Sequence, residues 1–179
     1  MTDHQDQQLK AVTTSLINAG VGTAFHKRHL GDVAPALVEP AKGPLLTTAR
    51  EGRGITLVGR DRAYDGAVLL ARAMHLQGVG SLVVPLRRLV KWLEHDTEDA
   101  TRAANVSALF VTNFFDHAVD CPLTGWQLQD VETLFNDRID NSLANFPQVT
   151  CILGRGGWWS DTLVRRLARL NSVQELTDP

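Results

Sequence analysis

Apolar positions along the chain follow two different periods. Short β-branched runs bounded by glycine or proline predict buried strands in "GITLVG", "GSLVVPL", "VSALFVTNFF" and "QVTCILG". Between these runs, apolar residues at helical spacing predict helices over 66–77, 86–95, 126–143 and 161–170. Strands that alternate with helices of this length predict an α/β fold whose mainly parallel sheet is covered on both faces.

The N-terminal region has a different pattern. Leu9, Val12, Leu16 and Ile17 lie near one face of a helix predicted over 7–19. The residues that follow alternate glycine, proline and charged side chains, which predicts an irregular connector. We therefore expect an N-terminal helix and connector over 1–53 and an α/β core over 54–174. A helix this short is marginal alone, so its apolar stripe needs burial on the core or on another protein.

Residues suited to helix capping stand at the predicted starts of two helices. Thr124 and Gln127 have the spacing of a capping box, in which hydroxyl and amide satisfy two backbone N–H groups reciprocally. Ser160 precedes the helix predicted over 161–170 and is also a favoured cap residue.

Length and composition narrow the class of protein. The chain has 179 residues, enough for one domain with a hydrophobic core, and a net charge of −2, which argues against strong sequence-independent nucleic-acid binding. No apolar run is long enough to cross a bilayer, and the polar start does not resemble a signal peptide, so we expect a cytoplasmic protein.

The six histidines and two cysteines lack metal-ligand spacing, and no nucleophile motif is present. We expect no metal, no cofactor and no catalytic constellation.

The stretch "GRDRAYDG" at 59–66 follows a predicted strand and precedes a predicted helix, which is the setting of a phosphate-binding loop. A working loop, G-x-x-x-x-G-K-[ST], needs glycines that let backbone N–H groups wrap the phosphates, a lysine, and a hydroxyl for magnesium. Counted from Gly59, these roles fall on Tyr64, Asp65 and Gly66. A carboxylate there would repel a triphosphate, and we expect Asp65 either to cap the helix in place of phosphate or to be an ordinary helix-start acid.

A second nucleotide-binding motif also lacks the residues that its function requires. In nucleotide hydrolases of this architecture an apolar strand ends in an acidic residue that holds magnesium. Here the strand ends in Thr112 and Asn113, which cannot bind a metal by charge, and Asp116 lies beyond the expected position. The sequence thus predicts a nucleotide-binding frame without nucleotide chemistry.

The order of segments resembles the ATPase domain of DnaC/DnaI-type replicative helicase loaders, including loader-like replication proteins of temperate phages. The segment "AGVGTAFHKRHLGDV" is similar to the family's "AGIPxRF" lead-in, and residues 54–95 match the layout from its first strand to the helix after its second. Farther on, "VETLFNDRIDNSLANFPQVTCILG" resembles the family's helix that ends in "INxRY" and the strand after it, and "DTLVRRLARL" resembles "GERVxDRL". The likeness covers residues 15–171 and rests on spacing and apolar pattern.

The resemblance implies an AAA+-like domain of P-loop type, of phage or prophage origin, that binds a replicative DNA helicase and single-stranded DNA. Asp65, Thr112, Asn113 and Gly154 depart from the family's ATPase residues, which implies a pseudo-ATPase and not an enzyme. Arg165 and Arg169 match the arginines of the family's last helix. With no nucleotide to reach, they are expected to contact a partner or a second copy of the chain, or to be solvated surface residues.

Basic residues offer candidate DNA contacts. The resemblance places Arg87, Arg88 and Lys91 in a region that contacts DNA in the family. Two further groups could follow a DNA backbone if they converge, with a solvated charged face as the alternative. They are His26, Lys27, Arg28 and His29 in the connector, and Arg50, Arg53, Arg60 and Arg62 around the start of the core.

Trp158 and Trp159 follow a flexible "GRGG", where they could stack on bases or insert into a partner. Because tryptophan is also a large core residue, burial of at least one is expected.

Two other functions fit the same features. A regulator that inhibits helicase loading would use the same helicase-binding surface. A small-molecule enzyme of doubly wound α/β fold would place its site at the carboxyl ends of the strands, near Gly59, Asn113 and Gly154.

Overall fold

The core is a five-stranded sheet in which every strand pair is parallel. The computed structural model describes residues 3–38, 54–58, 61–112, 123–143, 149–153 and 159–176. The strand order is β2-β3-β4-β1-β5. The bounds are β1 (Gly54–Val58), β2 (Ser81–Pro85), β3 (Ala108–Thr112), β4 (Val149–Leu153) and β5 (Asn171–Glu175). The prediction of an α/β fold with a mainly parallel sheet is confirmed.

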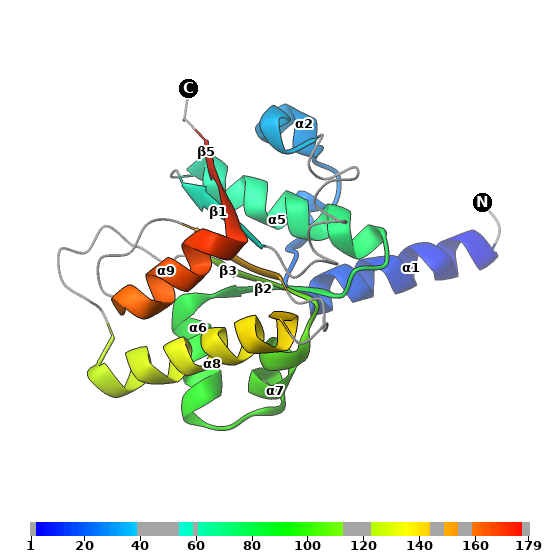
Figure 1. The fold of residues 1–179 in the computed structure, drawn as a ribbon. Coiled ribbons are helices and arrows are strands. Elements are labelled where there is room, and N and C mark those ends of the chain that lie inside the picture. The colour runs from blue at the N-terminus through cyan, green and yellow to red at the C-terminus, as the bar shows by residue number, and fades with distance from the viewer. Residues whose placement is uncertain are drawn as a thin grey trace.

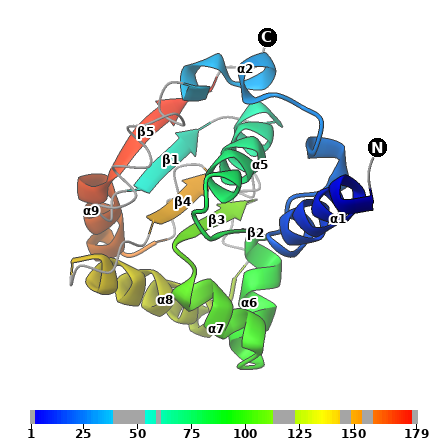
Figure 2. The ribbon, with the colours of Figure 1, turned by 90° about the vertical axis from the view of Figure 1, so that its right-hand side faces the viewer.

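Helices cover both faces of the sheet (Figures 1 and 2). Alternation along β3 sends Phe110 toward one face and Leu109 and Val111 toward the other, as a pleated strand requires. The first face carries α5 (Asp61–Leu76). The second face carries α6 (Leu86–Glu94), α7 (Glu98–Asn105), α8 (Gly125–Leu143) and α9 (Asp161–Leu170). None of the described helices is long and apolar enough to cross a membrane.

The caps expected at α8 and α9 are both formed. The Gln127 N–H donates to Thr124 Oγ1 at 3.4 Å, and the Thr124 N–H donates to Gln127 Oε1 at 2.9 Å. At α9 the Leu163 N–H donates to Ser160 Oγ at 3.3 Å. These bonds satisfy backbone donors that have no partner inside the helix.

Two elements of the α/β core were not predicted. Helix α7 contains only alanines as apolar residues, of which Ala100 and Ala103 are buried, so its sequence lacks a strong apolar stripe. Strand β5 has the sequence NSVQE, with one aliphatic residue, and it pairs along its whole length with β1 at one edge of the sheet. Tertiary pairing therefore overrides a weak local preference at β5.

The start of α5 corrects the prediction of a loop over 59–66 and a helix over 66–77. The helix begins at Asp61, so Gly66 is helical. A Cβ at Gly66 would lie 3.0 Å from Leu176 Cδ1 and 3.3 Å from Leu37 Cδ1. Glycine at this position therefore allows close packing on α5 and does not end a flexible loop.

The N-terminal helix α1 (Asp3–Asn18) leads into short helices, which are η1 (Thr23–Phe25), α2 (Leu30–Val33) and η2 (Pro35–Leu37). Between α1 and η1 the chain covers the outer edge of β2, where the Val83 N–H donates to the Ala19 carbonyl at 2.8 Å. Gly20 has a φ of 81°, and a Cβ there would lie 2.1 Å from the Val83 carbonyl oxygen. Only glycine fits this close approach.

Arg138 on α8 is an internal support that no sequence pattern predicted. Its side chain is buried, and one guanidinium nitrogen donates to the carbonyls of Ala103, Ala104 and Val106 at 2.8–3.1 Å. These carbonyls belong to the last turn of α7 and the residue after it, where backbone acceptors need partners and positive charge is favourable. Arg138 therefore fixes α7 against α8.

Candidate functional site

Two residues that the sequence predicts at phosphate-loop positions contact the chain's own N-terminal segment. Tyr64 packs edge-on against Phe25, with ring centroids 6.1 Å apart. The Asp65 carboxylate pairs with Arg28 at 2.7 Å, and the Arg28 guanidinium lies 5.2 Å from the centre of the Phe25 ring. The prediction that Asp65 caps the helix in place of phosphate is wrong, because Asp65 lies in the second turn of α5.

Arg72, farther along α5, adds to this attachment. Its guanidinium donates to the carbonyl of His26 at 2.8 Å and to that of Arg28 at 3.3 Å. The basic cluster at 26–29 therefore lies against α5, with Arg28 engaged by Asp65. Lys27 and His29 remain exposed.

The other expected nucleotide positions are only partly described. Thr112 ends β3, is fully buried, and its hydroxyl has no hydrogen-bond partner among the described residues. Gly59, Asn113 and Gly154 lie outside the described residues, as do Arg50, Arg53 and Arg60. Within the described part of the chain, no group of three or more potential ligands could hold a metal ion.

The candidate DNA-binding residues Arg87, Arg88 and Lys91 are exposed on α6. This helix starts directly after β2, and α5 starts shortly after β1, so both begin at the carboxyl edge of the sheet. Arg62 stands in the first turn of α5, although its side chain lies outside the description. Two strands separate β2 from β1, which places the ends of these two strands about 14 Å apart at the usual strand spacing, and the two helices then lie on opposite faces of the sheet.

Helix α1 divides into an attached end and a projecting end (Figure 1). Leu16 is buried in the core, so it cannot serve as a partner-binding residue, and that prediction is corrected. Val12 is 44% exposed and Ile17 is 49% exposed. The side chain of Leu9 lies outside the described residues. The predicted apolar stripe is therefore split between the core and the solvent.

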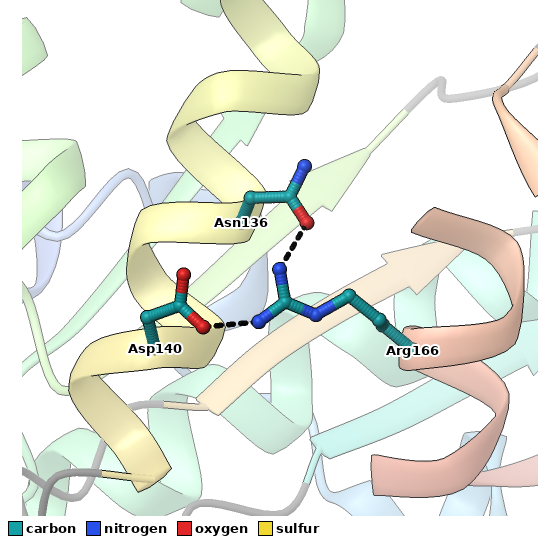
Figure 3. Close-up of polar contacts among 3 residues, drawn as sticks. All are labelled: Asn136, Asp140 and Arg166. Carbon is teal, nitrogen blue, oxygen red and sulfur yellow. Dashed lines mark hydrogen bonds and ion pairs between the residues drawn. The ribbon is translucent and has the colours of Figure 1, made fainter. Parts of the chain in front are cut away.

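The arginines of α9 differ in their surroundings, since Arg166 contacts α8 whereas Arg165 and Arg169 are exposed. Arg166, which no sequence motif singled out, donates to Asn136 Oδ1 at 2.6 Å and pairs with Asp140 of α8 (Figure 3). Arg165 is 77% exposed in its side chain, and its contact with Asp161 is 3.9 Å long. Arg169 is also exposed. The two arginines predicted to contact a partner or a second copy are therefore accessible.

The described tryptophans differ widely in exposure to solvent. Trp159 is buried against Phe135 with ring centroids 6.1 Å apart, which confirms that at least one of the pair 158–159 is in the core. Trp158 lies outside the described residues. Trp126, which no sequence motif singled out, is 79% exposed in the first turn of α8.

Comparison with known proteins identifies the fold. The solved structure of the DnaC helicase loader superimposes with a TM-score of 0.65, covering 87% of this chain and 99% of that one, at 13% sequence identity. No family model matches the sequence. No curated protein sequence matches it either. The chain thus shares the fold of that loader, and at this identity the likeness establishes the fold alone.

Proposed function

We propose that this chain is a helicase-loader-like DNA replication protein that binds a replicative helicase through α1 and acts without hydrolysing ATP. The observation that carries the proposal is the exposed side of α1, where Val12 and Ile17 are accessible on a protein with the fold of a helicase loader. Exposed aliphatic residues on an isolated helix favour a contact in which the apolar face is buried on a partner. A protein with this role would act in the cytoplasm.

The arrangement around α5 supports independence from nucleotide. A phosphate loop requires non-helical backbone whose N–H groups point at the phosphates, whereas residues 61–66 here form the start of α5. Asp65, at the lysine position, pairs with Arg28 and so helps to hold the N-terminal segment. In this proposal an intramolecular contact performs the positioning role that nucleotide has in an active ATPase.

The exposed cations of α6 support contact with single-stranded DNA. Arg87, Arg88 and Lys91 have no ion pair with any described residue, so they are available to phosphates. Their contribution should be independent of sequence and strongly salt dependent, because counterions are released when phosphates are neutralised. R87E/R88E should weaken binding of an oligothymidylate at least about tenfold in low salt, which fluorescence anisotropy would measure.

Recovery of a replicative helicase from the native host with the tagged full chain tests the proposal. Co-purification of the helicase with the wild-type protein is expected, and its absence from repeated preparations would remove the proposal's basis. A helicase-unwinding assay then separates two modes of action. Stimulated delivery of the helicase to single-stranded DNA indicates a loader, and suppressed delivery indicates an inhibitor that uses the same surface.

A further inference from the structure

The two edges of the sheet differ in how they are covered. At the β2 edge the chain between α1 and η1 lies along the strand, and the Val83 N–H donates to the Ala19 carbonyl. At the opposite edge β5 pairs with β1 on its inner side, and no described strand pairs with its outer side. Figure 2 shows β5 at the end of the sheet away from α1, and none of the described helices or strands lies beyond it along the sheet. The outer side of β5 therefore offers an edge to another strand.

The composition of β5 does little to protect this edge. Edge strands are usually protected by proline, lysine, inward-pointing charges or bulges. The β5 sequence NSVQE has no proline or lysine, and its one charged residue, Glu175, ends the strand. The pairing of β5 with β1 is continuous over five residues, so no bulge interrupts it. Val173, at the centre of the strand, is 50% exposed.

Helix α9 presents small and aliphatic residues next to this edge. It packs on β1 and β5, and Arg166 joins it to α8, which lies toward the centre of the sheet (Figure 3). Val164 is two residues, or about 200°, from Arg166 around the helix, so it lies on the flank away from α8. Val164 is 42% exposed, and the exposed Ala168 lies one turn farther along the same flank.

We propose that β5 and this flank of α9 bind the same surface of a second copy of the chain, so that the two β5 strands pair antiparallel about a twofold axis at Val173. The two sheets then join into one continuous sheet. In this register Val173 stands opposite Val173 of the second copy, and Glu175 stands opposite Asn171, so no like charges are paired across the strands. The surface is therefore self-complementary, as a twofold contact requires.

The spacing of the elements fits this arrangement. Because α9 packs over both β1 and β5, its axis lies about 5 Å from the twofold axis, and the two copies of α9 lie about 10 Å apart, which suits packed helices. Val173 is two strand residues, or about 7 Å, from the end of α9, and this rise corresponds to between four and five helical residues at about 1.5 Å each. The axis therefore passes between Val164 and Ala168, and Val164 of one copy packs against Ala168 of the other.

The contact depends on backbone pairing and aliphatic burial. One short strand pair with one pair of short helices is a small interface, so we expect a dissociation constant of about 10–100 µM. Arg165 and Arg169 lie on the solvent side of α9 and take no part in the contact. Sedimentation should therefore show dimers and no larger species, at about 0.1 M and about 1 M salt alike, because screening has little effect on an uncharged contact.

Disulfide trapping tests the register. V173C should form a disulfide-linked dimer under mild oxidation, because directly opposite residues of antiparallel strands have Cα atoms about 4.5–5.5 Å apart. S172C should not, because position 172 of the second copy is shifted by two residues and lies about 8 Å away, beyond disulfide reach. The wild type is the baseline for any link through the native Cys121 and Cys151.

Charged substitutions test the energetics of the contact. V173K should weaken dimerisation at least about tenfold, because two lysines would face each other at the axis. V164K should also weaken it, because its charge would be buried against Ala168 of the second copy. L76K is the matched control, since Leu76 is 49% exposed at the end of α5 that contacts α1, and it should leave dimerisation unchanged. Circular dichroism melting would show that each variant is folded.

Several results would overturn the proposal. One is a wild-type protein that stays monomeric well above the expected dissociation constant, and another is a V173C variant that forms no linked dimer. A third is association that survives V173K and V164K but is lost in R165E/R169E, which would place the contact on the arginine side of α9. None of these outcomes depends on whether a helicase binds.

Discussion

The two parts of the N-terminal segment, one attached to the core and one exposed, have different relations to the rest of the molecule. From Leu16 to Leu37 the chain is held on the core by backbone pairing, buried side chains and the contacts of Arg28 and Arg72. From residue 10 to 15 the side chains of α1 are exposed, apart from the half-buried Thr13. Both parts belong to one continuous stretch of chain, yet only the first is stabilised by the fold.

The transition between the two parts is fixed at several points. Ser15 Oγ and His75 Nε2 share a hydrogen bond of 2.7 Å, and Arg102 donates to the Asn18 carbonyl at 2.7 Å. These contacts hold the end of α1 on α5 and α7, and the helix carries its exposed half away from the core (Figure 1). A rigidly mounted helix loses less conformational entropy on binding than a flexible tail would. The attached part would therefore lower the entropic cost of the partner contact that we propose for α1.

The largest expected effect is at Gly20, where the attached part crosses the edge of β2. Gly20→Ala should lower the free energy of unfolding by about 3–4 kcal/mol, because the new Cβ would meet a backbone oxygen and the positive φ is strained. Gly78→Ala is the matched control, since Gly78 has a φ of 83° and an added Cβ there would have no described atom within 4 Å. It should cost only about 1–2 kcal/mol. Equal losses in urea denaturation would argue against a tight contact with β2.

A smaller effect is expected at Gly66, where η2 packs on α5. Gly66→Leu should lower the free energy of unfolding by about 1–3 kcal/mol, because Leu37 and Leu176 must move to admit the side chain. Gly66→Ala should be nearly neutral, since a gain of up to about 1 kcal/mol in helix propensity offsets a mild contact with mobile side-chain ends. Thermal melting of both variants measures this. A stabilising Gly66→Leu would show that the segment does not pack closely there.

Much of the fold could be predicted from periodicity, and the failures have physical causes. Strands β1 to β4 and the long helices could be predicted because their apolar patterns are strong. Strand β5 and helix α7 were missed because pairing with β1 and burial of alanines stabilise them. The start of α5 was misplaced because Gly66 was given the role of a loop residue, whereas contacts from distant parts of the chain determine its role.

The candidate site was predicted less well. Sequence could place Val12 and Ile17 on a helix but could not show that Leu16 turns into the core, because that depends on how α1 meets the sheet. It singled out Asp65 as the residue expected at the lysine position of a phosphate loop, but not its partner Arg28, which is 37 positions earlier in the chain. The exposure of Trp126 had no sequence signal, since tryptophan is usually buried to a large extent.

Asp65→Lys tests the proposal that contacts between the N-terminal segment and α5 take the positioning role of a bound nucleotide. Loss of the half-exposed Arg28 pair and the new repulsion should lower the free energy of unfolding by less than about 1 kcal/mol. Restoring a lysine at this position should not create ATP binding, because residues 61–66 remain helical. Calorimetry with ATP and magnesium measures this, for the wild type as well as the variant. Micromolar affinity in either protein would contradict nucleotide independence.

The smallest effect on stability is expected at the exposed aliphatic residues of α1. V12D/I17D should change the free energy of unfolding by no more than about 0.5 kcal/mol, because both side chains are about half exposed. A11D/T14D introduces the same charge at other exposed positions of the helix and is the matched control. A larger loss of stability in V12D/I17D, measured by urea denaturation, would mean that these residues support the core.

Affinity for the replicative helicase, measured with these two variants and the wild type, tests the central claim most directly. V12D/I17D should bind the helicase at least about tenfold more weakly than the wild type, which corresponds to about 1.4 kcal/mol. A11D/T14D should keep the wild-type affinity, and both proteins should melt at the wild-type temperature. Undiminished helicase binding by a folded V12D/I17D would contradict the assignment of α1 as the helicase-binding element.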